Sequence, residues 1–352
     1  MTTRLAVIPG DGIGPEVVAE ALKTLDAVEA VYHPDVRVEM LPYGADHYLR
    51  TGVTIPPEEM RRLGSECEAV LVGALGDPRV PGNEHARDIL LGMRFQLDLY
   101  VNERPARLFA ERLTPLKGKR PADLQLMVFR ENTEGLYVSV GGTFKQGTPD
   151  EIAIAEELNT RKGVERIVRY AFEWAAAHGK TRVTMADKAN AIPAHGLWRR
   201  VFDEVGREHP GITRDTRYID AMAMDLVRTP ESFQVIVTGN LFGDILSDLA
   251  SMLVGGLGLA PSANRHPGAV TMYEPVHGSA PPLAGKNVAN PMAAILTLAM
   301  MLADRGAAAA AGAVEGAVRA AIDAGVGTAD VGGTMGTREV GDWIAARVRA
   351  GA

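Results

Sequence analysis

Two aspartates, Asp244 and Asp248, are the only charged residues between Gly239 and Gly258. Residues four apart share one face of an α-helix, where two like charges cost about 0.2–0.5 kcal/mol. A surface helix tolerates that cost, so the spacing alone is also compatible with a solvated face. In a stretch this poor in charge, however, two neighbouring carboxylates favour a bound cation, and oxygen ligands suit Mg²⁺ or Mn²⁺.

Three arginines, Arg94, Arg104 and Arg130, form a second group of candidate ligands. A guanidinium group binds a carboxylate through two parallel hydrogen bonds. Arg130 follows the predicted strand 124–129, and α/β folds place their ligands at such strand ends. The three residues indicate a dicarboxylate substrate, although their spacing does not show that they converge and each would also serve in a surface ion pair.

Three further residues are candidates for proton transfer or metal binding. Lys188 follows the predicted strand 182–185 and is a candidate base if its surroundings lower its pKa. Tyr137 comes directly after the loop 130–135. Asp220 is a lone acid in an apolar run, so it is either a helix cap or a third metal ligand. Taken singly, each of the three is equally compatible with a structural role.

The hydrophobic pattern indicates the elements that must position these residues. Short apolar runs predict buried strands, and the alternation of Leu97, Leu99 and Val101 predicts one more. Helices are predicted from Pro15, around 89–93, and over 162–177, 292–303 and 307–324, besides the helix that carries the two aspartates. The strands lie at 5–8, 69–72, 124–129, 182–185 and 233–237. Alternating strands and helices predict an α/β fold.

Composition narrows the class of protein. A chain of 352 residues is long enough for two domains. The net charge of -7, from 44 acidic and 37 basic residues, argues against nucleic acid or an anionic membrane as the main partner. Cys67 is the only cysteine, which excludes an intrachain disulfide, and the longest apolar stretch, 292–303, is shorter than the roughly 20 residues of a membrane span. We therefore expect a cytoplasmic protein.

Glycines at positions 10, 12 and 14 approximate a dinucleotide-binding fingerprint, but Pro15 stands where its last glycine belongs. The order of other motifs is more specific. Residues 10–16, Arg130-Glu131-Asn132-Thr133-Glu134-Gly135, 239–248, Glu274-Pro275-Val276-His277-Gly278-Ser279-Ala280-Pro281 and 330–333 together resemble the β-decarboxylating dehydrogenases. Members of that family act on isopropylmalate, isocitrate, homoisocitrate, tartrate or D-malate.

The resemblance implies an isopropylmalate/isocitrate dehydrogenase-like open α/β fold of two domains, distinct from a Rossmann fold. Residues 1–98 and 253–352 would form the cofactor-binding domain, and residues 99–252 the domain that holds substrate, metal and the dimer interface. The family forms homodimers with shared active sites, so a homodimer is expected here.

The resemblance also implies individual roles. Arg94, Arg104 and Arg130 would hold the malate carboxylates, while Asp244 and Asp248 bind Mg²⁺ or Mn²⁺ together with the partner subunit's Asp220, which also contacts substrate. The partner subunit's Lys188 would take the hydroxyl proton, and Tyr137 would protonate the enol. NAD would contact Glu274, His277, Gly278, Ser279, Ala280 and Asn290. Leu90 and Leu91 stand where isopropylmalate enzymes hold the alkyl group, which predicts oxidative decarboxylation of 3-isopropylmalate in leucine biosynthesis.

Some positions depart from the family pattern. Pro282 replaces an aspartate of NAD-dependent members, yet NAD is still expected because nothing nearby would bind a 2′-phosphate. Arg87 and Asp88 occupy a stretch that often carries a glutamate, and the stretch 255–262 recurs in homoisocitrate enzymes. The alternatives are a paralogue acting on homoisocitrate, tartrate, D-malate or a specialised-metabolism acid, or a non-catalytic regulatory subunit. The last is disfavoured because the catalytic and metal-binding candidates are all retained.

Overall fold

The computed structural model describes residues 2–351, which form two compact units. The first comprises residues 2–99, 105–124 and 251–351, and the second comprises residues 100–104 and 125–250. Residues 105–124, which the sequence-based division assigns to the second domain, lie in the first unit. Phe109 explains this difference, because its ring is buried in the core of that unit.

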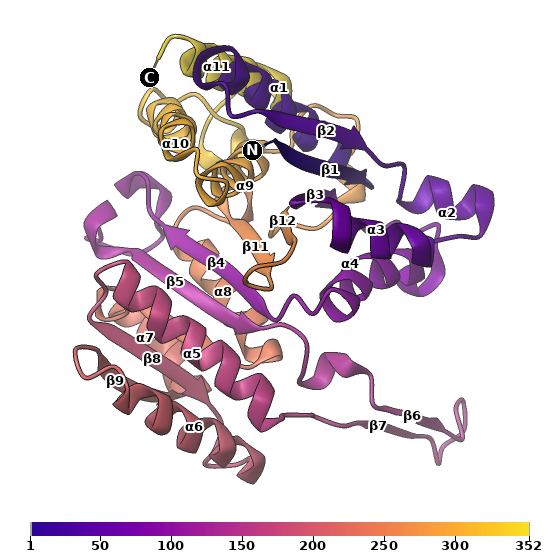
Figure 1. Cartoon of the computed structure of the whole chain (residues 1–352), viewed down its shortest axis with the longest axis vertical. Helices are drawn as coiled ribbons and strands as arrows, with labels where there is room; N and C mark the ends of the chain where they lie inside the picture. Colours follow the sequence, from indigo (N-terminus) through magenta and orange to yellow (C-terminus); the bar gives the residue numbers. More distant parts are fainter. Residues whose placement is uncertain (1, 352) are drawn as a thin grey trace. The chain divides into compact units, whose positions relative to one another are not determined.

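The first unit contains a sheet with strand order β2-β1-β3-β12-β11 (Figure 1). Its strands are parallel except for the antiparallel pair β11 and β12. The strands are β1 (Thr3–Gly10), β2 (Val36–Met40), β3 (Ala69–Ala74), β11 (Pro261–Arg265) and β12 (Thr271–Pro275). The helices are α1 (Gly14–Tyr32), α2 (Ala45–Thr51), α3 (Pro57–Glu66), α4 (Glu84–Gln96), α9 (Met292–Asp304), α10 (Ala308–Asp323) and α11 (Thr337–Arg349).

Strand β1 shows why this sheet is covered on both faces. Leu5 and Val7 point into a core formed with α1, α9, α10 and α11, whereas Ala6 and Ile8 point into a second core formed with α3 and α4. Because successive side chains of a strand point to opposite faces, a continuous apolar run buries both of them. Helix α9 is apolar on all sides and buried, as its sequence predicts, and no helix among residues 2–351 is long and apolar enough to span a membrane.

The second unit contains a parallel run with the order β5-β10-β8-β9 (Figure 1). Helices α5 and α6 lie in front of these strands in that view, with α7 and α8 behind. The strands are β4 (Val101–Arg107, its first four residues in this unit), β5 (Gln125–Glu131), β8 (Arg182–Asp187), β9 (Thr213–Tyr218) and β10 (Val235–Thr238). The helices are α5 (Arg161–Ala177), α6 (Gly196–Arg207), α7 (Ile219–Arg228) and α8 (Asn240–Leu253).

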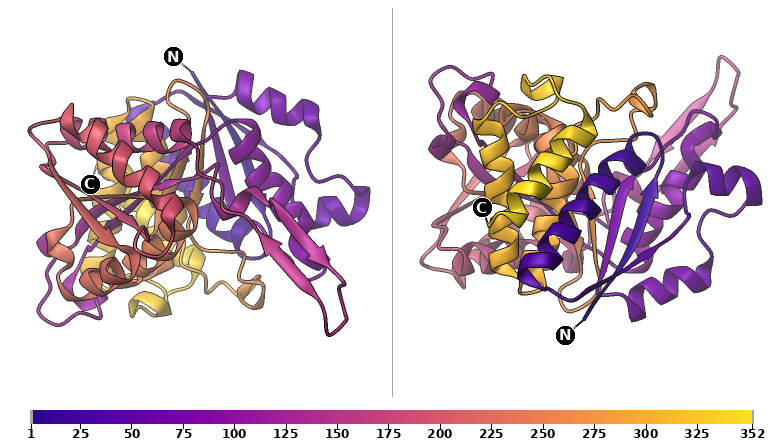
Figure 2. Two further views of the ribbon diagram at one scale, coloured as in Figure 1. Left: turned by 90° about the horizontal axis from the view of Figure 1, so that it is seen from below. Right: turned by 90° about the horizontal axis from the view of Figure 1, so that it is seen from above.

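A hairpin of β6 (Gly141–Phe144) and β7 (Ile152–Ala155) extends away from the helices of the second unit (Figure 2). Phe144, Ile152 and Ile154 on this hairpin are exposed. A two-stranded ribbon without a hydrophobic face packed on a core is marginally stable by itself. Phe144, Ile152 and Ile154 therefore give this hairpin an exposed apolar surface.

One predicted strand boundary is wrong. Leu97 does not belong to a strand, because α4 continues to Gln96 and Leu97 is its C-cap. The chain then reverses at Asp98, whose φ is 48°, and β4 begins only at Val101. The alternation of Leu97, Leu99 and Val101 therefore arises from a helix end followed by a turn. Over so few residues, this arrangement gives the same alternation of apolar and polar residues as a strand.

Candidate active site

The candidate residues of the second unit lie at the carboxyl ends of adjacent parallel strands. Arg130 is near the end of β5, Lys188 follows β8, and Asn240 begins α8 directly after β10. Because β5, β10 and β8 are neighbours and parallel, these three residues emerge at the same edge of the sheet. This edge is where open α/β sheets bind their ligands.

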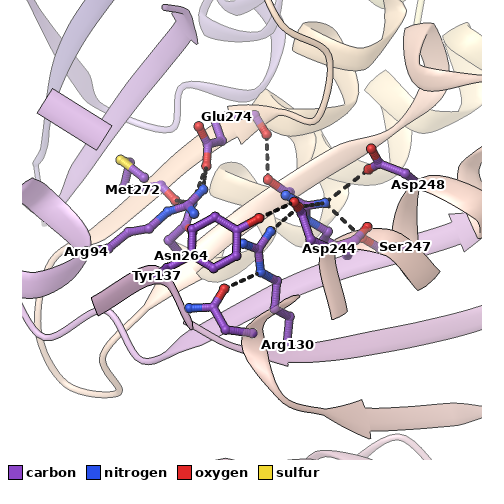
Figure 3. A network of polar contacts seen from close by, with 12 residues as sticks. Arg94, Arg130, Tyr137, Asp244, Ser247, Asp248, Asn264, Met272 and Glu274 are labelled. Atoms are coloured by element: carbon purple, nitrogen blue, oxygen red, sulfur yellow. Dashed lines mark hydrogen bonds and ion pairs between the residues drawn. The ribbon is translucent and has the colours of Figure 1, made fainter. Parts of the chain in front are cut away.

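The two predicted aspartates lie one helical turn apart on α8, and both face arginines (Figure 3). Arg130 is buried, and its Nη1 donates to Asp244 Oδ1. Arg104 Nη1 lies 3.2 Å from Oδ1 of both Asp244 and Asp248, and it also donates to Ser247 Oγ at 2.8 Å. Two positive and two negative side chains thus form one compact cluster. The structure brings together Arg104, Arg130, Asp244 and Asp248 from distant parts of the sequence.

Tyr137 completes this cluster. Its hydroxyl donates to Asp244 Oδ2 at 2.9 Å, and the Arg130 guanidinium lies over its ring at 5.2 Å from the centroid (Figure 3). A tyrosine in this position places a proton donor beside the carboxylates, as general acid catalysis requires.

Sequence reasoning missed Asn240. Its side-chain oxygen accepts from Arg130 Nε at 2.9 Å, and its amide nitrogen donates to the backbone oxygen of Glu134 at 2.9 Å. Glu131 was missed as well. Buried at the end of β5, it accepts from the backbone nitrogens of Thr133 and Glu134, and burial raises its pKa. Their places within the two most specific motifs were the only signal that could have identified them.

Lys188 and Asp220 are paired with each other. Lys188 Nζ donates to Asp220 Oδ1 at 2.6 Å, and this hydrogen bond is the main cause that lowers the pKa of Asp220. Asp220 lies in the first turn of α7, and its side chain is not the N-cap. The structure therefore places the candidate base beside the candidate third metal ligand within one chain.

The donor set at Asp244 and Asp248 suits a hard divalent cation, because both residues offer carboxylate oxygens and the Asp248 side chain is 52% exposed. Among residues 2–351, no three His, Cys, Asp or Glu side chains are grouped closely enough to hold a metal ion. The second unit thus supplies two carboxylates in one place, with Asp220 committed to Lys188.

In the first unit, Arg94 is nearly buried on α4, and its Nη2 donates to Glu274 Oε1 at 2.8 Å (Figure 3). Asn264 donates to the same oxygen at 2.9 Å. Glu274, a predicted cofactor contact, therefore orients Arg94. Leu90 and Leu91 lie one turn before Arg94 on the same helix and are half-buried, with Leu90 packed against the core.

The glycine-rich turn after β1 packs against Ser279, which lies in the loop of predicted cofactor contacts. Ile13 N donates to Ser279 O at 2.8 Å, and a Cβ on Gly12, whose φ is +60°, would lie 2.0 Å from that oxygen. His277 Nδ1 bonds to the oxygen of Gly278, while its buried Nε2 has no hydrogen-bond partner among the described residues. Burial lowers the pKa of His277, so its imidazole is neutral near pH 7 and offers Nε2 as an acceptor.

The remaining predicted cofactor contacts have different surroundings. Gly278 is exposed, and Ala280 adopts a left-handed backbone with φ of 38° directly before Pro281 and Pro282. Asn290 is nearly buried and occupied within the protein. Its Nδ2 donates to Asp330 at 2.9 Å, and its Oδ1 accepts from Met292 N at the start of α9.

Comparison with known proteins identifies the family. Residues 4–344 match the family described as isocitrate/isopropylmalate dehydrogenase. The chain belongs to this family. It is 45% identical to a 3-isopropylmalate dehydrogenase of Thermobifida fusca, with 99% of this chain and 98% of that protein covered. A 3-isopropylmalate dehydrogenase of Streptomyces griseus is 47% identical, with 98% of each chain covered.

A solved structure supports the same assignment. Isocitrate dehydrogenase from Methylococcus capsulatus is 37% identical and superposes with a TM-score of 0.89, covering 99% of this chain and all of that one. The family resemblance inferred from the sequence motifs is therefore confirmed, and so is the α/β fold of the isocitrate/isopropylmalate dehydrogenase type.

Proposed function

We propose that the protein catalyses the NAD- and metal-dependent oxidative decarboxylation of 3-isopropylmalate to 4-methyl-2-oxopentanoate, a step of leucine biosynthesis. The observation that carries this proposal is the cluster of Arg104, Arg130, Tyr137, Asp244 and Asp248, which combines carboxylate-binding, cation-binding and proton-donating groups. The 3-isopropylmalate dehydrogenases that resemble this chain over nearly its whole length support the choice of substrate.

Arg94, Arg104 and Arg130 are the groups proposed to bind the two malate carboxylates. Each guanidinium is already oriented by an acidic neighbour, so little side-chain entropy is lost when it binds substrate. Leu90 and Leu91 would contact the isopropyl group. Burying such a group contributes about 2 kcal/mol, or roughly thirtyfold in kcat/KM over malate.

Asp244 and Asp248 are proposed to hold Mg²⁺ or Mn²⁺, assisted by the partner subunit's Asp220. Such a cation would supply Lewis-acid stabilisation of the negative charge that develops at the substrate C2 oxygen. The loop 274–280 is proposed to hold NAD, with the free Nε2 of His277 accepting from a cofactor hydroxyl group.

A single buried cysteine, Cys67, fits a reducing cytoplasm.

The partner subunit's Lys188 is proposed to take the proton from the C2 hydroxyl, and bound NAD would accept the hydride from C2. To act as the base, the lysine amine must be released from Asp220 and lose its own proton. After the C3 carboxylate departs as CO₂, the enol needs a proton at C3. Tyr137 is the proposed donor, because its hydroxyl points into the carboxylate cluster.

A homodimer with shared active sites is part of the proposal. Met224 on α7 and Ile245 on α8 are more than half exposed, as are Phe144 and Ile154 on the hairpin. Large apolar side chains gathered on one unit favour a protein–protein interface. A second copy of the chain would cover them and would bring the partner's Lys188 and the partner's Asp220 to the cluster.

The test is a panel of 3-isopropylmalate, malate, isocitrate and homoisocitrate, each assayed with NAD and with NADP. We expect 3-isopropylmalate with NAD to have the highest kcat/KM. Lys188→Met should slow NADH formation and CO₂ release together, whereas Tyr137→Phe should slow the later step by about 10²–10⁴-fold and leave keto acid on the enzyme. A preference for isocitrate or homoisocitrate would instead identify a paralogue with another substrate.

A further inference from the structure

The turn that carries Lys188 is held by one face of the segment that follows it. Lys188 N donates to His195 Nδ1 at 3.0 Å. Arg199, four residues beyond His195, binds the Asp187 carboxylate through Nε at 2.7 Å and Nη2 at 3.1 Å. Consecutive residues of the turn are therefore fixed by two side chains spaced one helical turn apart.

His195 is locked in one tautomer. Because Nδ1 accepts a backbone N–H, it carries no proton, and Nε2 must be the protonated nitrogen. Nε2 lies 2.9 Å from Glu157 Oε1, to which it donates, and this hydrogen bond lowers the pKa of Glu157. The imidazole is 3% exposed and meets the ring of Phe242 edge-on at 5.6 Å. The two hydrogen bonds and the contact with Phe242 thus restrict rotation of the His195 imidazole.

Glu157 begins a four-residue segment, 157–160, which we call the strap. Inside the strap, Asn159 donates to Glu157 at 3.0 Å and accepts from Trp198 Nε1 at 2.8 Å. At its far end, both the backbone nitrogen and the hydroxyl of Thr160 donate to the Glu134 carboxylate. Between these ends, Leu158 exchanges backbone hydrogen bonds with Gly135, at 2.7 and 3.3 Å.

The strap therefore contacts two catalytic loops at once. One is the turn of Lys188, reached through His195, and the other is the loop 134–135, which leads directly to Tyr137. A cavity of about 150 Å³ is lined by residues of both loops, among them Gly135, Leu136 and Asp187. Since this space is not filled by side chains, packing does not fix the distance between the loops.

We propose that the strap and His195 are positioning residues that hold Lys188 and Tyr137 of one chain for their proton transfers, Lys188 in the partner subunit's active site and Tyr137 in the site of its own chain. The identity of those transfers rests on the proposed function. None of the strap residues is assigned a contact with substrate, so their removal should change rates more than binding. A displacement near 1 Å of a catalytic group costs up to about 10²-fold in rate.

The kinetic test compares His195→Leu with His195→Asn. Asparagine keeps an acceptor near the position of Nδ1 for Lys188 N but is too short to reach Glu157, whereas leucine offers neither contact. We expect His195→Leu to lower kcat by at least about tenfold with KM for the malate substrate within about twofold. His195→Asn should recover most of that loss, and the solvent isotope effect on kcat should rise in the leucine variant.

Phe172→Leu is the matched control for lost stability, because Phe172 is fully buried in the same unit and lies outside the Lys188 turn and the strap. Equal kcat losses in Phe172→Leu and His195→Leu at the same thermal stability would overturn the proposal. So would a His195→Leu enzyme with wild-type kcat, or a His195→Asn enzyme no better than the leucine variant.

The second test does not depend on turnover. The ¹⁵N chemical shifts of the His195 imidazole should show a proton on Nε2 and none on Nδ1 at neutral pH, and Glu157→Gln should keep this tautomer. Thr160→Val should increase amide hydrogen exchange in the loop 134–135 and leave that of Lys188 within about twofold. An Nδ1-protonated imidazole would contradict the strap, whereas a wild-type enzyme inactive on 3-isopropylmalate would contradict only the proposed function.

Discussion

Arg104 and Arg130 share the negative charge of Asp244 and Asp248 in a cluster whose formal charge is zero. A divalent cation and the two carboxylates of a malate would add charges that also sum to zero. The cluster can therefore exchange its internal ion pairs for external ones without leaving a charge unpaired, which is costly in a partly buried site.

The metal proposal predicts that Asp248→Asn raises the Kd for Mn²⁺ by at least about tenfold, because a charged ligand becomes neutral. Titration of Mn²⁺ followed by electron paramagnetic resonance measures this directly. Asp203→Asn is the control, since Asp203 is an exposed aspartate on α6 of the same unit. Unchanged Mn²⁺ affinity in Asp248→Asn, or full turnover in excess chelator, would contradict the assignment.

The proline at position 282 leads to a prediction about cofactor affinity. Pro282→Asp should tighten NAD binding by about 1 kcal/mol, or roughly fivefold, because the new carboxylate can accept from a ribose hydroxyl. Pro282→Ala separates this effect from the loss of the proline ring. Fluorescence titration with NADH measures both variants, and equal gains in the two would show that ring removal is the cause.

At the level of single residues, the sequence predicts a site residue best when the signal is local. Asp244 and Asp248 could be identified from their spacing on an apolar helix. The pairing of Arg94 with Glu274 joins positions 180 residues apart, and nothing in either segment indicates it. His195 was missed for the same reason, because its contacts with Lys188 and Glu157 exist only after the chain has folded.

Among the elements, the turn after β1 depends on Asp11. Its buried carboxylate accepts from Ala45 N at 2.6 Å and Gly76 N at 2.8 Å, and lies 2.8 Å from His85 Nε2. One side chain thus ties the end of β1 to α2, to the end of β3 and to the start of α4. The residues that approximate a dinucleotide-binding fingerprint therefore have structural roles here. Asp11 joins neighbouring elements, and Gly12 allows the close approach of Ser279.

We predict that Asp11→Ala lowers the free energy of unfolding by about 3 kcal/mol, since several buried donors lose their acceptor at once. Chemical denaturation monitored by circular dichroism measures this value. Asp26→Ala, an exposed position on α1, should change it by less than about 0.5 kcal/mol. Similar losses at the two positions would mean that the Asp11 contacts contribute little net stability.

Glu157 of the strap should make the free energy of unfolding depend on pH. The pKa of Glu157 is lower in the folded protein than in the unfolded chain, so its contribution to stability is complete above about pH 4.3. That contribution disappears as the pH falls from there through the lowered folded-state pKa. Between those limits, the unfolding free energy of the wild type should therefore fall more steeply than that of Glu157→Gln. Glu173→Gln, at an exposed position on α5, should follow the wild type.

For the molecule as a whole, the apolar surface of α7 and the hairpin leads to a prediction about assembly. Met224→Asp should shift the protein from dimer to monomer in analytical ultracentrifugation, because a charge would have to be buried at the interface. Activity should be lost together with the dimer if active sites are shared. Lys162→Asp, which is exposed on α5, tests the effect of the charge alone. An active monomer would contradict shared sites.

The sequence predicts the α/β class and most strands and helices because each element carries its own periodicity. Division into units is harder, since it depends on which core a segment joins. Residues 105–124 contain little regular structure, and only the burial of Phe109 and its neighbours places them in the first unit. Local patterns contain no information about such choices between two apolar cores.

Trp198 gives the protein an intrinsic optical reporter. Its indole donates to Asn159 and borders the cavity beside the Lys188 turn. Trp174, by contrast, is stacked on His178 at 3.9 Å, and Trp343 belongs to the other unit. Loosening of the strap would expose the Trp198 indole to water and shift its emission to longer wavelength. Any change in this region when substrate, cation or cofactor is added would thus be followed in real time without an attached dye.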